Sequence, residues 1–147
     1  MTKKILYFDM DNVLVNFQSG LDQLSEEVLQ QYEGQLDNIL SVFSLMKPLD
    51  SAIEAYSTLA GTYDSYILST APWGNISSWS DKAAWVQTYL GHTAEKRLIL
   101  SHNKNLNIGN YLIDDRTANG AGQFMGEHIH FGSEKFPNWK SVLDYLL

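Results

Sequence analysis

The chain of 147 residues is long enough for one domain with a single hydrophobic core. Hydrophobic residues make up 44% of the sequence and charged residues 18%, a balance that excludes an intrinsically disordered chain. The formal net charge of −7, without any run of basic residues, argues against a nucleic-acid polymer as a partner. No apolar run approaches the roughly 20 residues of a membrane-spanning helix, so we expect no membrane partner. The absence of cysteine excludes a disulfide framework, and we expect a protein of the reducing cytoplasm.

The first expected element is a short buried strand over residues 5–8, directly followed by Asp9 and Asp11. In open α/β sheets, side chains at the carboxyl ends of strands project into a crevice where ligands bind. Two carboxylates so close together repel each other, which a divalent cation would relieve. The alternative is an ordinary turn, in which Asp-x-Asp also occurs.

A small helical cap is expected over residues 17–47. Apolar residues recur at helical spacing from Leu21 to Tyr32 and, after a Glu-Gly break, from Leu36 to Phe43. Two amphipathic helices inserted after the first strand would cover the crevice. The alternative is a plain crossover helix with a kink.

Strands and helices alternate through the rest of the chain. Further strands are predicted at residues 63–69, 97–101, 111–113 and 128–131, with helices between them and a last helix near the carboxyl terminus. This alternation predicts one α/β domain over residues 1–147, with a doubly wound, mostly parallel, Rossmann-like sheet.

Polar side chains follow three of these later strands, as they follow the first. Ser69 and Thr70 end the second strand, Lys104 lies in the loop after the third, and Asp114 and Asp115 end the fourth. Right-handed crossovers would bring all these strand ends to one edge of the sheet. Acids, hydroxyls and a lysine together suit Mg²⁺ binding and phosphoryl transfer, because magnesium prefers oxygen ligands and lysine pairs with phosphate oxygens.

Lys82 adds a second basic candidate. With Ser80 as the expected N-cap, Lys82 would lie in the first turn of a helix, where a cation opposes the helix dipole. An unfavourable position of this kind indicates a role such as contacting an anion.

Two further pairs of side chains each have two possible roles. His128 and His130 alternate with apolar residues and should point to one face of the last strand, where a structural role is favoured over metal binding. Trp73 and Trp79 either line the mouth of a substrate site or pack over the edge of the sheet.

The order of the polar strand ends resembles the haloacid dehalogenase (HAD) superfamily of phosphohydrolases. More narrowly, four stretches resemble the 5'(3')-deoxyribonucleotidase branch: Phe8-Asp9-Met10-Asp11, Ser69-Thr70-Ala71-Pro72, Asp81-Lys82-Ala83-Ala84-Trp85-Val86 and Leu112-Ile113-Asp114-Asp115-Arg116. The resemblance implies a HAD-like fold and a magnesium-dependent phosphomonoesterase. It also implies that the substrate is a (deoxy)nucleoside monophosphate.

The resemblance implies roles for the acidic residues. Asp9 would be the nucleophile that forms an aspartyl-phosphate, and Asp11 would be the general acid and base. Magnesium would be held by the Asp9 carboxylate, the Asp11 backbone carbonyl and Asp114, with Asp115 in support.

The resemblance also implies the substrate-binding residues. Thr70, which precedes Ala71-Pro72, would hold the phosphoryl group, with Ser69 as the second candidate. Lys104 would neutralise charge between the nucleophile and the phosphate, and Lys82 matches a second lysine that contacts phosphate.

Three positions depart from the pattern of the branch. Asn12 stands where a glycine is usual, Ala71 where a second hydroxyl is frequent, and His102 where a basic side chain is frequent. The expected cap is also short, and because substrate choice in this superfamily depends largely on the cap, a phosphatase for a non-nucleotide small molecule stays an alternative.

Two readings without catalysis are also considered. A phosphoacceptor signalling domain would carry adjacent acids on its first strand and its lysine last, whereas here Lys104 precedes the adjacent acids Asp114 and Asp115. A silent binding scaffold with the same fold would not need this complete set of acids and lysines.

Overall fold

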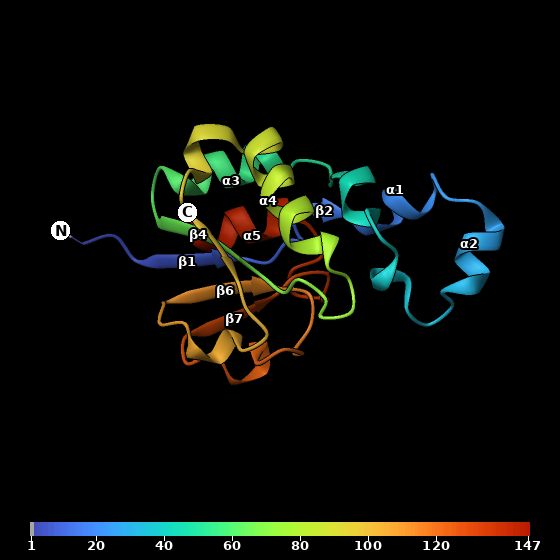
Figure 1. The fold of residues 1–147 in the computed structure, drawn as a ribbon. Helices are drawn as coiled ribbons and strands as arrows, with labels where there is room; N and C mark the ends of the chain where they lie inside the picture. The colour runs from blue at the N-terminus through green and yellow to red at the C-terminus, as the bar shows by residue number, and fades with distance from the viewer. Residues whose placement is uncertain (1) are drawn as a thin grey trace.

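A five-stranded parallel sheet forms the centre of the computed structural model, which describes residues 2–147. The strand order across the sheet is β5-β4-β1-β6-β7 (Figure 1). All five strands expected from the sequence are present, and the α/β class with a parallel sheet is confirmed. The strands are β1 (Ile5–Phe8), β4 (Asp64–Ser69), β5 (Leu98–Leu100), β6 (Tyr111–Asp114) and β7 (Glu127–His130).

The central strand β1 determines where the site lies. Phe8 is in register with Ile67 of β4 on one side and with Ile113 of β6 on the other. Strand order changes direction at β1, which makes the carboxyl end of β1 the usual ligand position in open α/β sheets. The residues that follow β1, β4 and β6 therefore meet at one edge.

The longer helices pack on one face of the sheet, as Figure 1 shows. Phe8 is fully buried there, and its ring lies 4.8 Å from that of Tyr56 and 5.8 Å from that of Trp139. A smaller cluster around Tyr7, Leu112 and Phe124 fills the other face. The longer helices are α3 (Ala52–Ala60), α4 (Ser77–Tyr89) and α5 (Trp139–Leu146). The 3₁₀ turns outside residues 17–47 are η3 (Gly91–Ala94), η4 (Lys104–Leu106) and η5 (Ala121–Gln123).

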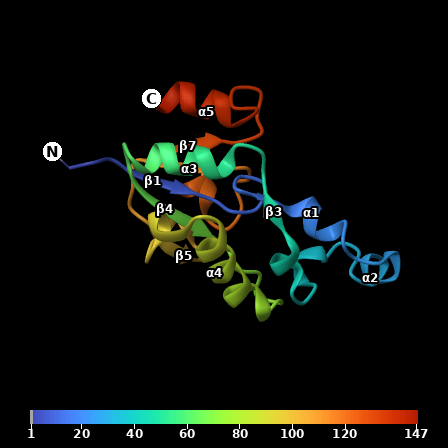
Figure 2. The same ribbon diagram turned by 90° about the horizontal axis from the view of Figure 1, so that it is seen from above.

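Residues 17–47, here called the cap segment, project beyond the carboxyl ends of the strands (Figures 1 and 2). Strands β2 (Val15–Asn16) and β3 (Lys47–Pro48) pair antiparallel at its base, so the chain leaves and re-enters the core at one place. The division into a core and a functional cap stays a prediction. The segment holds α1 (Phe17–Leu21), α2 (Glu26–Gln31), η1 (Leu36–Asn38) and η2 (Val42–Leu45).

The helices expected inside the cap segment differ from those observed. The first pattern is split because Ser25 begins a new helix, its side chain accepting a hydrogen bond of 3.3 Å from the Val28 amide. The second prediction was wrong: two 3₁₀ turns replace one helix, and Ser41 between them has a φ of +64°, which no α-helix accommodates.

Helix α4 begins at Ser77, four residues earlier than expected, so Ser80 is not its N-cap. Lys82 consequently lies in the second turn, and the prediction that its charge opposes the helix dipole in the first turn was wrong. Within residues 2–147, no helix is both long and apolar enough to cross a membrane.

Candidate active site

Lys104 joins the ends of two neighbouring strands. Its ammonium lies 3.0 Å from Asp9 Oδ1, after β1, and 2.6 Å from Asp114 Oδ2, at the end of β6. All three side chains are buried. Burial alone would lower the pKa of Lys104, but the two carboxylates outweigh it and the pKa is raised. Burial and the charge of Asp9 raise the pKa of Asp114, in part against the effect of Lys104.

Asp115 completes a group of three acids. One oxygen each of Asp9, Asp114 and Asp115 lies within 4.8 Å of the others. Burial, followed by the charge of Asp9, raises the pKa of Asp115 to about 7. Its Oδ1 is buried and has no hydrogen-bond partner among residues 2–147. This group offers carboxylate oxygens, one of them without a hydrogen-bond partner among residues 2–147, and such oxygens are the ligands that a hard divalent cation prefers.

Lys82 lies against Asp11 rather than in open space. Its fully buried ammonium is 3.1 Å from Asp11 Oδ2, 2.8 Å from Ser69 Oγ and 4.5 Å from the centre of the Phe43 ring. Burial raises the pKa of Asp11, and Lys82 opposes this rise. Lys82 thus does reach an anion, and that anion is a carboxylate of the protein itself.

Thr70 follows β4 at the same edge of the sheet. Its hydroxyl donates a 2.7 Å hydrogen bond to the backbone carbonyl of Ser101, just after β5. The neighbouring Ala71 is fully buried, so a methyl group occupies a place where the related branch often has a hydroxyl. Thr70 is half-buried, while Ser69 is buried and its hydroxyl is bound to Lys82.

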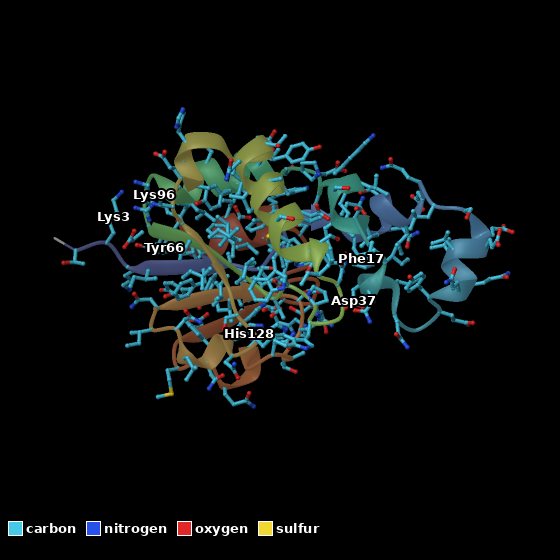
Figure 3. All side chains as sticks on the ribbon, in the orientation of Figure 1. Lys3, Phe17, Asp37, Tyr66, Lys96 and His128 are labelled. Atoms are coloured by element: carbon cyan, nitrogen blue, oxygen red, sulfur yellow. The ribbon has the colours of Figure 1, made fainter. Side chains whose placement is uncertain are left out.

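A cavity of about 480 Å³ opens beside these acids, between the strand ends and the cap segment. In Figure 3, Phe17 and Asp37 lie where the cap segment meets the core. Two larger hollows, of about 650 and 670 Å³, contain none of the predicted site residues. The cavity is lined by Asp11, Asn12, Phe17, Gly34, Leu36, Asp37, Asp115 and Arg116.

Two lining residues were missed from the sequence. Arg116 directly follows Asp114 and Asp115, and this adjacency could have predicted that Arg116 lies at the site. No sequence signal marked Asp37, because its position depends on the distant residue Asn75. The Asn75 side chain is fully buried, and its Nδ2 donates hydrogen bonds of 2.9 Å to the carbonyls of Asp37 and Ile39.

The departures from the related branch have local explanations. Asn12 has a φ of +62°, the left-handed conformation that favours glycine and that asparagine tolerates better than most residues. The His102 ring lies 6.0 Å from that of Trp73 and 6.2 Å from that of Trp79. Trp73 is 84% exposed, so packing over the sheet edge does not describe it.

The two histidines of β7 do share one face of the sheet, as predicted. Their ring centres are 5.6 Å apart with planes inclined by 21°. Each Nε2 lies within hydrogen-bonding distance of a backbone carbonyl, that of Asp114 for His128 and that of Asp115 for His130.

Three comparisons bear on the family. A model of the family described as "5' nucleotidase, deoxy (Pyrimidine), cytosolic type C protein" matches residues 22–140. A protein of Vibrio phage KVP40, named "Putative 5'(3')-deoxyribonucleotidase", is 61% identical over 144 residues, which cover 98% of this chain and 85% of the phage protein. A protein with the same name from Staphylococcus aureus strain Mu50 is 28% identical over 177 residues, with 100% of this chain and 97% of that protein covered.

Solved structures agree on the fold. The haloacid dehalogenase-like hydrolase SP0104 from Streptococcus pneumoniae has a TM-score of 0.59 at 14% identity, covering 98% of this chain and 91% of that one. The HAD-hydrolase YfnB from Bacillus subtilis, solved with bound magnesium, has a TM-score of 0.59 at 15% identity, covering 94% and 90%. The solved structures show that the fold is that of HAD-like hydrolases, and with the family match and the phage relative, this chain belongs to the deoxy 5'-nucleotidase family and is a phosphatase of the 5'-nucleotidase type.

Proposed function

We propose that this protein hydrolyses the phosphate monoester of a deoxyribonucleoside monophosphate through an aspartyl-phosphate on Asp9. The observation that carries the proposal is the buried group of Asp9, Asp114 and Lys104, joined by contacts of 3.0 and 2.6 Å beside a cavity. A buried lysine between two acids suits an anionic nucleophile, because it offsets the charge that a phosphate brings.

The reaction proceeds in two steps. An Asp9 carboxylate oxygen bonds to phosphorus while the bond to the ester oxygen breaks, and Asp11 gives a proton to the leaving oxygen. Water then attacks the aspartyl-phosphate, Asp11 takes a proton from that water, and inorganic phosphate leaves with Asp9 restored. Asp11 Oδ1 has no partner among residues 2–147, and Asp11 lines the cavity, which supports this role.

The residues present fit a magnesium ion. Asp9, Asp114 and Asp115 offer hard oxygen donors within 4.8 Å of one another, and we propose that they hold Mg²⁺ with the Asp11 backbone carbonyl. The magnesium in YfnB supports the choice of metal. When bound, the ion would offset the repulsion between the carboxylates and the phosphate.

The phosphoryl oxygens are expected to be held by Lys104 and Thr70, with Ser69 as the second hydroxyl. Lys82 is proposed to act on the phosphate chiefly through Asp11, because its ammonium is fully buried and already binds that carboxylate.

The nucleotide class is supported by the family and by the phage relative. The cavity adds an aromatic ring, Phe17, and two charged side chains, Asp37 and Arg116, where the leaving group would lie. We propose that the cap segment forms that wall. The cytoplasmic location expected from the sequence stays a prediction.

The test is a hydrolysis screen with Mg²⁺ against deoxyribonucleoside and ribonucleoside monophosphates, sugar phosphates and phosphorylated small acids. We expect deoxyribonucleoside monophosphates to have the highest kcat/KM and the Asp9→Asn variant to lose about a thousandfold or more in kcat. Undiminished activity of Asp9→Asn would remove the nucleophile assignment. A preference for sugar phosphates or small acids would favour the non-nucleotide alternative.

A further inference from the structure

The histidine pair of β7 has no part in the proposed chemistry, yet both side chains contact residues Asp114 and Asp115, here called the acid loop. His128 Nε2 lies 3.0 Å from the carbonyl oxygen of Asp114, and His130 Nε2 lies 2.9 Å from that of Asp115. Figure 3 places His128 on the side of the sheet formed by β6 and β7. The parallel register pairs Asp114 with His130, which brings these rings beside the loop.

The chemistry of the two contacts is defined by their acceptors. A carbonyl oxygen can only accept, so each Nε2 must carry a hydrogen and donate it. Each ring therefore restrains one peptide plane of the acid loop. Because a peptide unit is rigid, fixing the direction of its carbonyl also fixes the orientation of the two Cα atoms that it joins.

The two carbonyls differ in how many donors they have. That of Asp114 also accepts from the Phe131 amide at 3.1 Å, as a continuation of the β6–β7 ladder. Asp115 lies beyond the end of β6, and His130 is the donor to its carbonyl. The direction of the Asp115 side chain thus depends more on His130 than that of Asp114 depends on His128.

We propose that His128 and His130 are positioning residues for the cation-binding acids, with His130 holding Asp115 in place. The inference rests on the proposed Mg²⁺ site. It assigns the pair a task beyond packing: Asp115 keeps an oxygen within 4.8 Å of Asp9 and Asp114, although its Oδ1 has no protein partner within residues 2–147 to hold it. Hydrogen bonds that orient metal ligands in this way are worth about 10- to 100-fold in metal affinity.

The experiment compares His130→Leu with His130→Gln. The glutamine amide nitrogen can occupy nearly the place of Nε2 and donate, whereas leucine cannot. Mg²⁺ affinity is measured by calorimetric titration of the metal-stripped protein, and kcat at saturating Mg²⁺ is measured separately. We expect His130→Leu to weaken Mg²⁺ binding about tenfold and His130→Gln to stay within about threefold of the unmodified protein.

His128→Leu serves as the internal comparison, with a smaller loss of affinity because the Asp114 carbonyl keeps the Phe131 amide. Since His130 is exposed, its variants should fold, which urea unfolding checks. Equal Mg²⁺ affinity of His130→Leu and the unmodified protein would overturn the inference, as would equal losses in the leucine and glutamine variants. An unmodified protein that binds no Mg²⁺ would overturn the proposed metal site and this inference with it.

Discussion

The Lys104 ammonium lies 2.6 Å from Asp114 Oδ2 in a place where both side chains are almost completely buried. Replacement by methionine keeps an unbranched side chain of nearly the same length and removes its charge, which leaves Asp9 and Asp114 without the ammonium of Lys104. We expect Lys104→Met to lower kcat at least 100-fold and the free energy of unfolding by about 3 kcal/mol. Steady-state kinetics and urea unfolding measure the two effects.

The matched control for that variant is Lys140→Met. Lys140 pairs with Asp144 at 2.8 Å, but the Lys140 side chain is 83% exposed and screened by water, so its loss should leave the unfolding free energy nearly unchanged. Similar losses in the two variants would show that burial of the Lys104 pair is not what matters.

Lys82→Met should reduce kcat more than it raises KM. Lys82 binds Asp11 Oδ2 at 3.1 Å, so its loss disturbs the proposed proton donor, whereas loss of a direct phosphate contact would chiefly raise KM. We expect kcat to fall about 100-fold, with KM within about threefold of the unmodified value. A large rise in KM with unchanged kcat would contradict this and restore the direct phosphate contact that the family resemblance implies.

Asp115 makes the metal-free protein sensitive to pH. Its pKa is about 7 in the folded protein against 3.8 for the free side chain, so the folded state holds a proton that the unfolded state has lost. Stability should therefore fall as pH rises from about 4 through about 7, by roughly 1 to 2 kcal/mol after allowance for partial exposure. Thermal unfolding of Asp115→Asn should show a smaller fall, because Asp11 and Asp114, whose pKa values are also raised, still contribute, and Mg²⁺ should oppose the fall. An unchanged slope in Asp115→Asn would contradict the prediction.

Asn75→Ala tests the attachment of the cap segment. The variant leaves the carbonyls of Asp37 and Ile39 without their side-chain donor, and we expect a loss of about 2 to 3 kcal/mol in urea unfolding. Gln87→Ala, at an exposed position of α4, is the control and should change stability by less than about 0.5 kcal/mol. Equal stability of the two variants would mean that the cap segment does not depend on Asn75.

Tyr56 and Tyr63 form a matched pair of buried tyrosines. The Tyr56 hydroxyl has no partner within residues 2–147, whereas that of Tyr63 donates to the Leu146 carbonyl at 2.6 Å. Tyr56→Phe should stabilise the protein by about 1 kcal/mol, and Tyr63→Phe should destabilise it by about the same amount. Chemical denaturation at neutral pH measures both, and a destabilised Tyr56→Phe variant would contradict the prediction.

Tyr56 also makes the stability of the protein depend on pH at alkaline pH. Burial raises the pKa of Tyr56 from 10.0 to about 12, so the folded state stays protonated where the unfolded state ionises. The free energy of unfolding of the unmodified protein should therefore decrease as pH rises from about 10 through 12. Tyr56→Phe lacks this contribution, so its stability relative to the unmodified protein should increase further in this range.

Local patterns in the sequence were enough for the sheet and for the residues at its edge. The apolar run that ends at Asp9 and the run that ends at Asp114 could be recognised because a buried parallel strand is short, apolar and bounded by polar residues. The rule that parallel strands meet at one edge then predicts that these acids lie close together, and Lys104 joins them in the structure.

Contacts between distant segments decided the rest. Lys82 was assigned a role from its place on a helix, but its actual partners, Asp11 and Phe43, come from the turn after β1 and from the cap segment and have no sequence signal. The cap segment itself departed from its helical pattern because the positive φ of Ser41 outweighed apolar spacing. Asp37 lines the cavity because the buried side-chain amide of Asn75 holds the backbone carbonyl of Asp37 by a hydrogen bond. The sequence alone determined which side chains stand at the strand ends, since that depends on neighbours along the chain. Only the tertiary structure decided how they pair and what faces them, since buried charges and carbonyls take their partners from whatever elements the fold brings near.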